Sequence, residues 1–282
     1  MHLTLWGTRG SIAAPGPDTA RYGGNTSCAQ VHDGDDDHFL ILDAGSGIRL
    51  AGMRIPWGKV RIDILLTHLH LDHILGLGFF APLHNPDADI HIWGPASQTL
   101  TLQERLMRYL SPPYFPLHFR ELPCQIKLHE VFNETGLSIG GFRVDSSLVI
   151  HPGPTVAFRV TGRRGKTVVY MPDHEPALGV DNFPMEPEWT SGYGLAAGAD
   201  LLVHDSQYSH EEYDDRVGWG HSTLEQALRF GQLCEVKRFV TFHYDPAHTD
   251  EHLDDLIQTG IDAARPTYEV IGGTEGATYS LD

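Results

Sequence analysis

The sequence predicts an α/β (α+β) fold, because short strand-like segments recur along the chain and two stretches follow helical spacing. The strand-like segments are apolar and are separated by glycine and proline, which is typical of sheet strands joined by turns. In the N-terminal part they cover residues 2–6, 27–32, 38–42, 62–66 and 90–93. No repeat and no serine-, glycine- or charge-rich linker divides the chain, so we expect a single domain over residues 1–282.

One predicted helix covers residues 97–110 and begins at Ser97, a good N-cap. The side chains that recur at helical spacing are Leu100, Gln103, Met107 and Leu110. The helix must end at residues 111–113, because the two prolines there cannot continue it. We expect the aromatic residues that follow, Tyr114 and Phe115, to form a substrate-facing lip that stacks on a ring or base. The alternative is that they close the core.

A second predicted helix opens at Ser222, because Glu225 follows three residues later in the capping-box pattern. Its apolar face contains Leu224, Ala227, Leu228 and Gly231. His221 then lies just outside a helix N-terminus, where the helix dipole favours an oxyanion. The alternative is that His221 only caps the helix.

The composition is that of an ordinary globular protein, with 41% hydrophobic and 20% charged residues. The formal net charge of −17 weighs against a long nucleic acid as partner, because binding a polyanion needs a basic face. A small anion is compatible with this charge, because divalent cations would reverse the sign of the potential locally. The three cysteines are too few and too far apart for a disulfide framework, so we expect them to be reduced.

The N-terminal residues enter a strand pattern directly, without the basic and apolar regions of a secretory signal. No segment of the sequence is apolar and long enough to cross a bilayer. We therefore expect a cytoplasmic protein that has no membrane partner.

A cluster of metal-binding side chains follows the apolar run 62–66. Its members are His68, His70, Asp72 and His73, in the pattern H-x-H-x-D-H. Imidazole nitrogens together with a carboxylate suit zinc and its neighbours. Alternate residues of an extended segment point the same way, so we expect His68, His70 and Asp72 to converge while His73 points to a second position. The alternative is an accidental cluster in a chain that contains 18 histidines.

Three apolar runs in the second half also end at a potential ligand. Residues 147–150 lead to His151, residues 167–171 lead to Asp173 and residues 238–242 lead to His243. Sites in α/β proteins are commonly built just past strand ends. These three positions therefore support a metal centre that draws on distant parts of the chain.

The order and spacing of these residues resemble the metallo-β-lactamase superfamily, and the resemblance extends over nearly the whole chain. It implies a four-layer αββα sandwich with one or two metals at the edge of the two sheets. It also implies a ligand set for two divalent ions, with His68, His70 and His151 on one, Asp72, His73 and His243 on the other, and Asp173 bridging both. Asp43 would support the metal loop from behind, with a plain strand-end turn as the alternative. We expect Zn²⁺, although Mn²⁺ and iron tolerate these ligands.

Such a centre implies hydrolysis, with a metal-bridging hydroxide as nucleophile that Asp72 helps to orient. Segments 201–207 and 220–227 resemble those of the phosphodiesterase branch, which includes RNase Z-type enzymes and a cyclic phosphodiesterase. In that branch the histidine corresponding to His221 is the general acid, oriented by an acidic residue. Here that residue is Asp205, where the tRNA enzymes usually have glutamate. The side chain that pairs with His221 is therefore one methylene shorter.

The substrate class is inferred from what the chain lacks. The tRNA enzymes of this branch use a long basic, glycine-rich arm, whereas only 21 residues separate His151 from Asp173. We therefore expect a small anionic phosphodiester such as a cyclic nucleotide. The alternatives are a lactonase, thioesterase or β-lactamase-type acyl hydrolase, and a non-catalytic metal-bound binding protein. Related phosphodiesterases are often dimers, so a homodimer is also expected from the resemblance.

Overall fold

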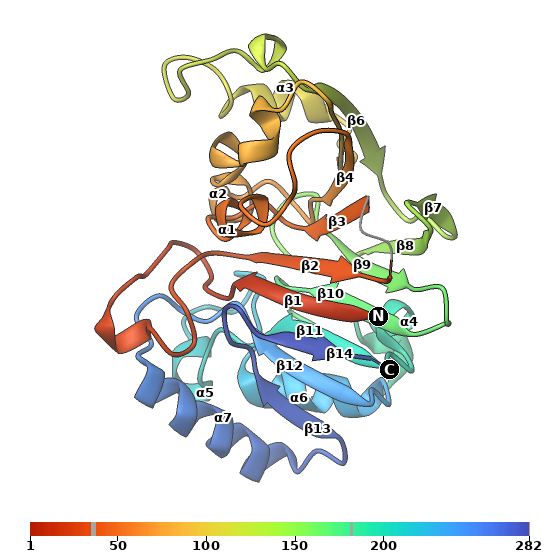
Figure 1. Ribbon diagram of the computed structural model, residues 1–282. Helices are drawn as coiled ribbons and strands as arrows, with labels where there is room; N and C mark the ends of the chain where they lie inside the picture. Colours follow the sequence, from red (N-terminus) through yellow and green to blue (C-terminus); the bar gives the residue numbers. More distant parts are fainter. Residues whose placement is uncertain (35–37, 181–182, 282) are drawn as a thin grey trace.

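The computed structural model describes residues 1–34, 38–180 and 183–281, and within them the chain forms two seven-stranded sheets (Figure 1). The first sheet has the order β14-β1-β2-β3-β4-β5-β6. Its strands are β1 (His2–Gly7), β2 (Cys28–His32), β3 (His38–Leu42), β4 (Val60–Leu65), β5 (Ala88–Pro95), β6 (Gln125–Val131) and β14 (Thr278–Ser280). Strands β3 to β6 run parallel to one another.

The second sheet has the order β13-β12-β11-β10-β9-β8-β7. Its strands are β7 (Leu137–Ile139), β8 (Phe142–Leu148), β9 (Val156–Thr161), β10 (Thr167–Met171), β11 (Leu201–Asp205), β12 (Arg238–Phe242) and β13 (Glu269–Gly272). Strands β10 to β13 are parallel, so their carboxyl ends lie at one edge of the sheet. That edge receives Asp173, Asp205 and His243, which is where parallel sheets commonly build sites.

Helices cover the outer faces of both sheets (Figure 1). The α-helices are α1 (Ile48–Gly52), α2 (Leu71–Ile74), α3 (Leu102–Met107), α4 (Tyr193–Ala196), α5 (His210–Tyr213), α6 (Leu224–Leu233) and α7 (Asp250–Ala264). Short 3-10 segments lie at Pro17–Thr19, Leu77–Phe79, Ala81–His84, Phe119–Glu121 and Pro187–Trp189. Helices α1 to α3 pack on the first sheet and α4, α6 and α7 on the second, which confirms the four-layer αββα sandwich.

The strand sequences explain the layers. In β3, Leu40 and Leu42 enter the core between the sheets, whereas Ile41 packs under the helices of the first sheet. In β12, Val240 and Phe242 enter the same central core, whereas Phe239 packs under the helices of the second sheet. Successive side chains of a strand point to opposite faces, so a strand that is covered on both faces is apolar throughout.

The predicted helix 97–110 was too long. Helix α3 begins at Leu102, and its N-cap is Thr101, which forms a capping box with Glu104. The Ser97 hydroxyl instead accepts a hydrogen bond from the Thr99 backbone N–H at 3.4 Å. The threonine and glutamate satisfy each other's backbone donors, so the helix starts where this reciprocal pair is complete.

The cap of α6 also differs from the prediction. The N-cap is Thr223, paired with Gln226, and not Ser222 with Glu225. Ser222 is held elsewhere, because its N–H donates to Asp205 at 3.0 Å and its hydroxyl donates to the His174 carbonyl at 2.5 Å. The strand predicted to lead up to His151 likewise ends early, at Leu148. Within the described residues, no helix is long and apolar enough to span a membrane.

Candidate metal centre

The histidine-rich segment follows strand β4 and forms a loop that passes into helix α2. Asp43 anchors the start of this loop by accepting hydrogen bonds from the backbone N–H of Thr67 at 2.7 Å and from its hydroxyl at 2.9 Å. The expected convergence of Asp72 with His68 and His70 was wrong. The segment becomes helical at Leu71, so Asp72 turns toward His73 and away from the first two histidines.

The structure brings the seven candidate ligands into two groups, and within each group one ligand atom per residue lies within 4.8 Å of all the others. The first group is His68, His70, His151 and Asp173, and the second is Asp72, His73, Asp173 and His243. Asp173 belongs to both groups, because its two carboxylate oxygens face different sets of imidazoles. This is the arrangement that a carboxylate bridging two cations requires.

In the first group, Nδ1 of His70 lies 2.9 Å from Nε2 of His68 and 3.1 Å from Nε2 of His151. Both of those Nε2 atoms lie 3.6 Å from Oδ2 of Asp173. His68 and Asp173 are buried, whereas His70 is exposed. This group therefore contains the one exposed ligand of the seven, His70.

In the second group, all four side chains are buried. Oδ1 of Asp173 lies 3.0 Å from Nε2 of His73 and 3.4 Å from Nε2 of His243. Oδ2 of Asp72 lies 3.2 Å from each of the same two nitrogens. The Ser11 backbone N–H donates to that Asp72 oxygen at 2.8 Å, which fixes the carboxylate from the opposite side.

The protonation states of the first group suit cation binding, whereas in the second group the carboxylates of Asp173, Asp72 and Asp43 outweigh burial and raise the pKa of His73 well above its ordinary value, so a cation must displace a proton there. Burial lowers the pKa of His151 to about 4, and it lowers the pKa of His68 well below its ordinary value, so these imidazoles are neutral near pH 7. Burial alone would raise the pKa of Asp173, but the surrounding imidazoles of His243, His73 and His68 hold it well below its ordinary value. Neutral imidazoles and an ionised carboxylate are the forms that bind metals.

The residues present fit two divalent cations. Asp173 Oδ1 is buried and forms no hydrogen bond of acceptable geometry, although two imidazole nitrogens lie close to it. A buried carboxylate oxygen without a donor is costly, and a cation removes that cost. In four of the five ligand histidines, Nδ1 is held by a partner outside the centre, which leaves Nε2 to face the centre; for His68 that partner is the Thr67 hydroxyl at 3.1 Å.

Each of these Nδ1 atoms has a different partner. Nδ1 of His73 bonds Asp43 at 2.8 Å, and Nδ1 of His243 bonds the Gln207 side-chain oxygen at 2.9 Å. Nδ1 of His151 donates to the Gly220 carbonyl at 2.8 Å. Asp43 and His243 both have positive φ values, 59° and 61°, in the region that non-glycine residues seldom occupy. Such strained backbone clusters at functional sites.

His221 and Asp205 lie beside both groups, because the centroid of the His221 ring also lies 5.0 Å from that of His151 in the first group. Nδ1 of His221 lies 2.6 Å from Oδ2 of Asp205, and the His221 ring stacks on His243 with centroids 5.0 Å apart. Asp205 is fully buried and its other oxygen accepts the backbone N–H of Ser222 at 3.0 Å. Burial opposes the charged form of His221, but Asp205 outweighs it and raises the pKa of the imidazole.

Comparison with known proteins identifies the family. Residues 38–244 match the model of the beta-lactamase superfamily domain, and this span contains every candidate ligand. The chain belongs to the beta-lactamase superfamily. The resemblance inferred from the sequence motifs is thereby confirmed.

Several proteins are similar to this superfamily member in sequence or in fold. Ribonuclease Z of Thermococcus gammatolerans is 28% identical over 257 residues, which cover 76% of this chain and 77% of the relative. Ribonuclease Z of Haloferax volcanii is 26% identical over 287 residues, covering 86% and 84%. Among solved structures, the metallo-beta-lactamase fold protein YhfI from Bacillus subtilis has a TM-score of 0.69 at 20% identity and covers 99% of both chains. The short form of human tRNase Z has a TM-score of 0.68 at 21% identity, with 100% of both chains covered.

Two residues that shape the site in this structure were not among the predicted site residues. Glu175 is fully buried and accepts the backbone N–H of Gly218 at 3.0 Å and that of Gly220 at 2.9 Å, so it holds the loop that leads to His221. Gly10 packs on the His243 ring, where an added Cβ would lie 2.4 Å from Nδ1. The signal in the sequence that could have revealed Glu175 is its position two residues after the predicted ligand Asp173.

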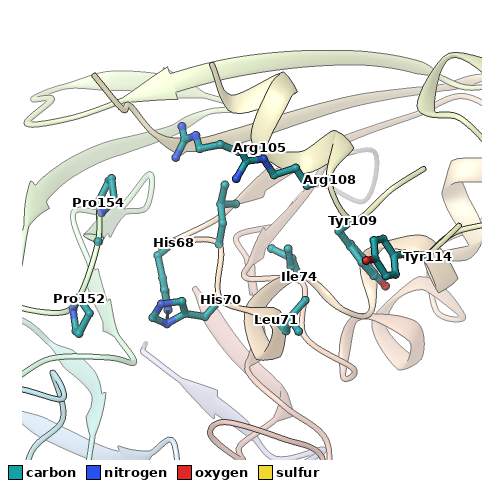
Figure 2. A pocket seen from close by; sticks show the side chains of 12 residues that line it. His68, His70, Leu71, Ile74, Arg105, Arg108, Tyr109, Tyr114, Pro152 and Pro154 are labelled. Carbon is teal, nitrogen blue, oxygen red and sulfur yellow. Dashed lines mark hydrogen bonds between the residues drawn. The ribbon is translucent and has the colours of Figure 1, made fainter. Parts of the chain in front are cut away.

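A cavity of about 670 Å³ opens beside His68 and His70 (Figure 2). Tyr114 lines this cavity and is 78% exposed, as a lip residue requires. The expectation for Phe115 was wrong, because its ring is buried in the core under the first sheet. The ring packs on Gly78, where an added Cβ would lie 2.6 Å from it, so the missing side chain of that glycine creates its slot.

Proposed function

We propose that this chain is a metal-dependent hydrolase that cleaves phosphodiester bonds at a centre of two divalent ions. The observation that carries the proposal is the His221–Asp205 pair, which lies beside both ligand groups. Acyl hydrolysis on the same ligands would not require a protonated imidazole at this place. Phosphodiester cleavage does, because the departing alkoxide needs a proton.

The proposed ligands are His68, His70 and His151 for one ion, Asp72, His73 and His243 for the other, and Asp173 between them. We propose Zn²⁺, with Mn²⁺ and iron as alternatives that accept the same nitrogen and oxygen donors. When bound, the two ions supply an acidic water and neutralise charge on the phosphoryl oxygens. Asp72 is held in place by Ser11, so its carboxylate can orient the attacking water. Asp43 fixes the ring of His73 from behind.

His221 is the proposed general acid. Its Nδ1 is taken by Asp205, which leaves Nε2 as the atom that can give a proton to the leaving oxygen. Asp205 raises the pKa of the imidazole against the effect of burial, so the ring can hold that proton near neutral pH. The buried carboxylate therefore both orients the ring and favours its charged form.

The proposed substrate is a small anionic phosphodiester, for example a cyclic nucleotide. The net charge of −17 and the short interval between His151 and Asp173 support a small substrate over a long nucleic acid. The sequence relatives named above are ribonucleases, so RNA is the substrate class against which this proposal must be tested.

A substrate panel tests the proposal. Metal-loaded protein should hydrolyse bis(p-nitrophenyl) phosphate and at least one cyclic nucleotide faster than it hydrolyses a lactone, a thioester or a β-lactam. Turnover of the acyl substrates alone would assign the chain to the acyl hydrolases. Full occupancy by two metals without turnover of any substrate would favour a non-catalytic binding protein. Cleavage of precursor tRNA at a higher kcat/KM than any small diester would contradict the proposed substrate size.

A further inference from the structure

The cavity beside His68 and His70 has a charge that is opposite to that of the chain. The sequence contains 37 acidic and 20 basic residues apart from histidine. The residues that line the cavity nevertheless include two arginines, Arg105 and Arg108, and no carboxylate. Figure 2 shows the side chains of Arg105, in α3, and of Arg108, at the C-terminal cap of α3, across the cavity from Pro152 and Pro154. The basic wall is therefore a local feature of the site.

The two arginines differ in how they are held. Arg105 is tied to the Pro95 carbonyl and lies 3.4 Å from Glu130, so its guanidinium is fixed at the rim. Arg108 is exposed, and its charge adds to the hydrogen bonds from Thr101 in lowering the pKa of Glu104 one turn earlier, but within the described residues its guanidinium lies within hydrogen-bonding or salt-bridge distance of no acceptor. Arginine presents a planar fork of donors that matches phosphate and carboxylate groups. Arg108 is thus available to an anion that enters the cavity.

Much of the remaining cavity wall is apolar. It contains the side chains of Leu69, Leu71 and Ile74, and Leu71 is 63% exposed although it is a large apolar residue. Tyr114 lies at the same opening and is 78% exposed. Exposed apolar and aromatic side chains in a concave site are typical of ligand contact surfaces. A ligand that spans this wall needs an apolar or aromatic middle part.

The position of His221 decides which part of the substrate enters the cavity. Neither His221 nor Asp205 is among the residues that line it. If His221 protonates the leaving oxygen, the leaving group lies on the His221 side of the centre. The cavity on the His68 and His70 side then receives the ester group that stays on the phosphorus.

We propose that this cavity binds the retained ester group of the substrate and that this group has a second anion, a phosphate or carboxylate, bound by Arg108 beside Arg105. The inference rests on the proposed phosphodiesterase function and extends it to a substrate class. The substrate is a phosphodiester whose retained part has an apolar or aromatic body and a distal negative charge, as in a nucleotide with a further phosphate. The scissile phosphate lies at the metal ligands and the distal anion at the α3 wall.

Paired chromogenic substrates test this inference. Thymidine 5′-(4-nitrophenyl phosphate) releases nitrophenolate and retains the nucleoside, and its 3′-phosphorylated and 3′-O-carboxymethyl derivatives add a distal anion. The wild-type protein should prefer the 3′-phosphorylated substrate by about tenfold in kcat/KM, as expected for one charge-assisted contact. Arg108→Ala should bring this ratio close to one and Arg108→Glu should invert it. Arg120→Ala removes an exposed arginine outside the cavity lining and should retain the wild-type ratio.

The ratio for the carboxymethyl substrate shows whether the distal site requires phosphate or accepts any anion. A wild-type ratio near one, or an unchanged ratio in Arg108→Ala, overturns the inference while both substrates are still turned over. Failure to hydrolyse either substrate overturns the proposed function instead. Calorimetric binding of thymidine 3′,5′-bisphosphate and thymidine 5′-monophosphate to metal-loaded protein then tests the distal site separately. The inference requires that the bisphosphate binds more tightly and that Arg108→Ala removes the difference.

Discussion

Nδ1 of His221 lies 2.6 Å from Oδ2 of Asp205, a full hydrogen bond although aspartate has one methylene less than glutamate. The short side chain reaches because strand β11 ends at Asp205 itself and the carboxylate also accepts the Ser222 backbone N–H. The segment that contains His221 and Ser222 is thus held close to the carboxylate. The backbone therefore compensates for the shorter side chain.

Asp205→Asn should reduce catalysis according to the leaving group. The amide cannot stabilise the imidazolium of His221, so proton transfer to a poor leaving group should slow by about 100-fold. Nitrophenolate leaves without a proton, so the loss on nitrophenyl diesters should be much smaller. The measurement is kcat for an alkyl and a nitrophenyl diester in the wild type and in the variant. Equal losses on both substrates would remove His221 as the acid.

Glu175→Gln should destabilise the protein and loosen the loop that holds His221. The carboxylate accepts hydrogen bonds from Gly218, Gly220 and Tyr213, and an amide would turn a donor toward one of them. We expect a loss of about 2–3 kcal/mol in the free energy of unfolding, measured by urea denaturation. Tyr213→Phe removes one of these bonds and should cost about 1 kcal/mol. Glu188→Gln, at an exposed glutamate, is the matched control. A similar loss of stability in that variant would show that the hydrogen bonds accepted by Glu175 do not hold the loop.

Gly10→Ala should weaken metal binding in the second group. The new methyl would lie 2.4 Å from Nδ1 and 2.5 Å from Cε1 of His243, so the ring would have to move. Displaced ligand rings typically cost about tenfold or more in metal affinity, measurable by competition with a chelator. Gly194→Ala adds a methyl with nothing within 4 Å and should bind metal like the wild type. Unchanged affinity in Gly10→Ala would show that His243 does not bind metal in this position.

The ion cluster at Asp63 should make stability depend on pH below the ordinary carboxyl range. Burial would raise the pKa of Asp63, but His38, Arg61 and Trp93 bond it and hold the pKa well below 3.8. Because the folded pKa is depressed, this stabilisation is present above about pH 4 and is lost as the pH falls toward the folded value. Asp63→Asn should therefore be less stable at pH 7 and show a shallower decline below pH 4. Asp87→Asn, at an exposed site, should follow the wild-type pH profile.

The sequence predicted those parts of the site that follow strand ends. The end of a strand fixes where the chain emerges, so the pattern of apolar runs was sufficient to place Asp173 and His243 just past strand ends, whereas the strand before His151 ends early at Leu148. Asp72 could not be placed by alternation, because the segment turns helical at Leu71. The direction of a side chain in such a loop depends on tertiary packing, which periodicity does not report.

Other features were hidden because they depend on partners far along the chain. Phe115 is buried because a glycine at position 78 leaves room for its ring. Ser222 is not a helix cap because Asp205 and His174 take its N–H and hydroxyl. Each of these residues is ambiguous in sequence until its neighbour is known. The caps and the aromatic lip were therefore less predictable than the ligand set.

The most direct measurement is the rate of bis(p-nitrophenyl) phosphate hydrolysis as Zn²⁺ is added stepwise to metal-free protein. The two ligand groups that share Asp173 predict that activity rises to a plateau at two equivalents per chain and that Asp173→Asn has no such plateau. A plateau at one equivalent, or no hydrolysis at any Zn²⁺ level with Mn²⁺ and Fe²⁺ equally inactive, would contradict a phosphodiesterase with a two-metal centre.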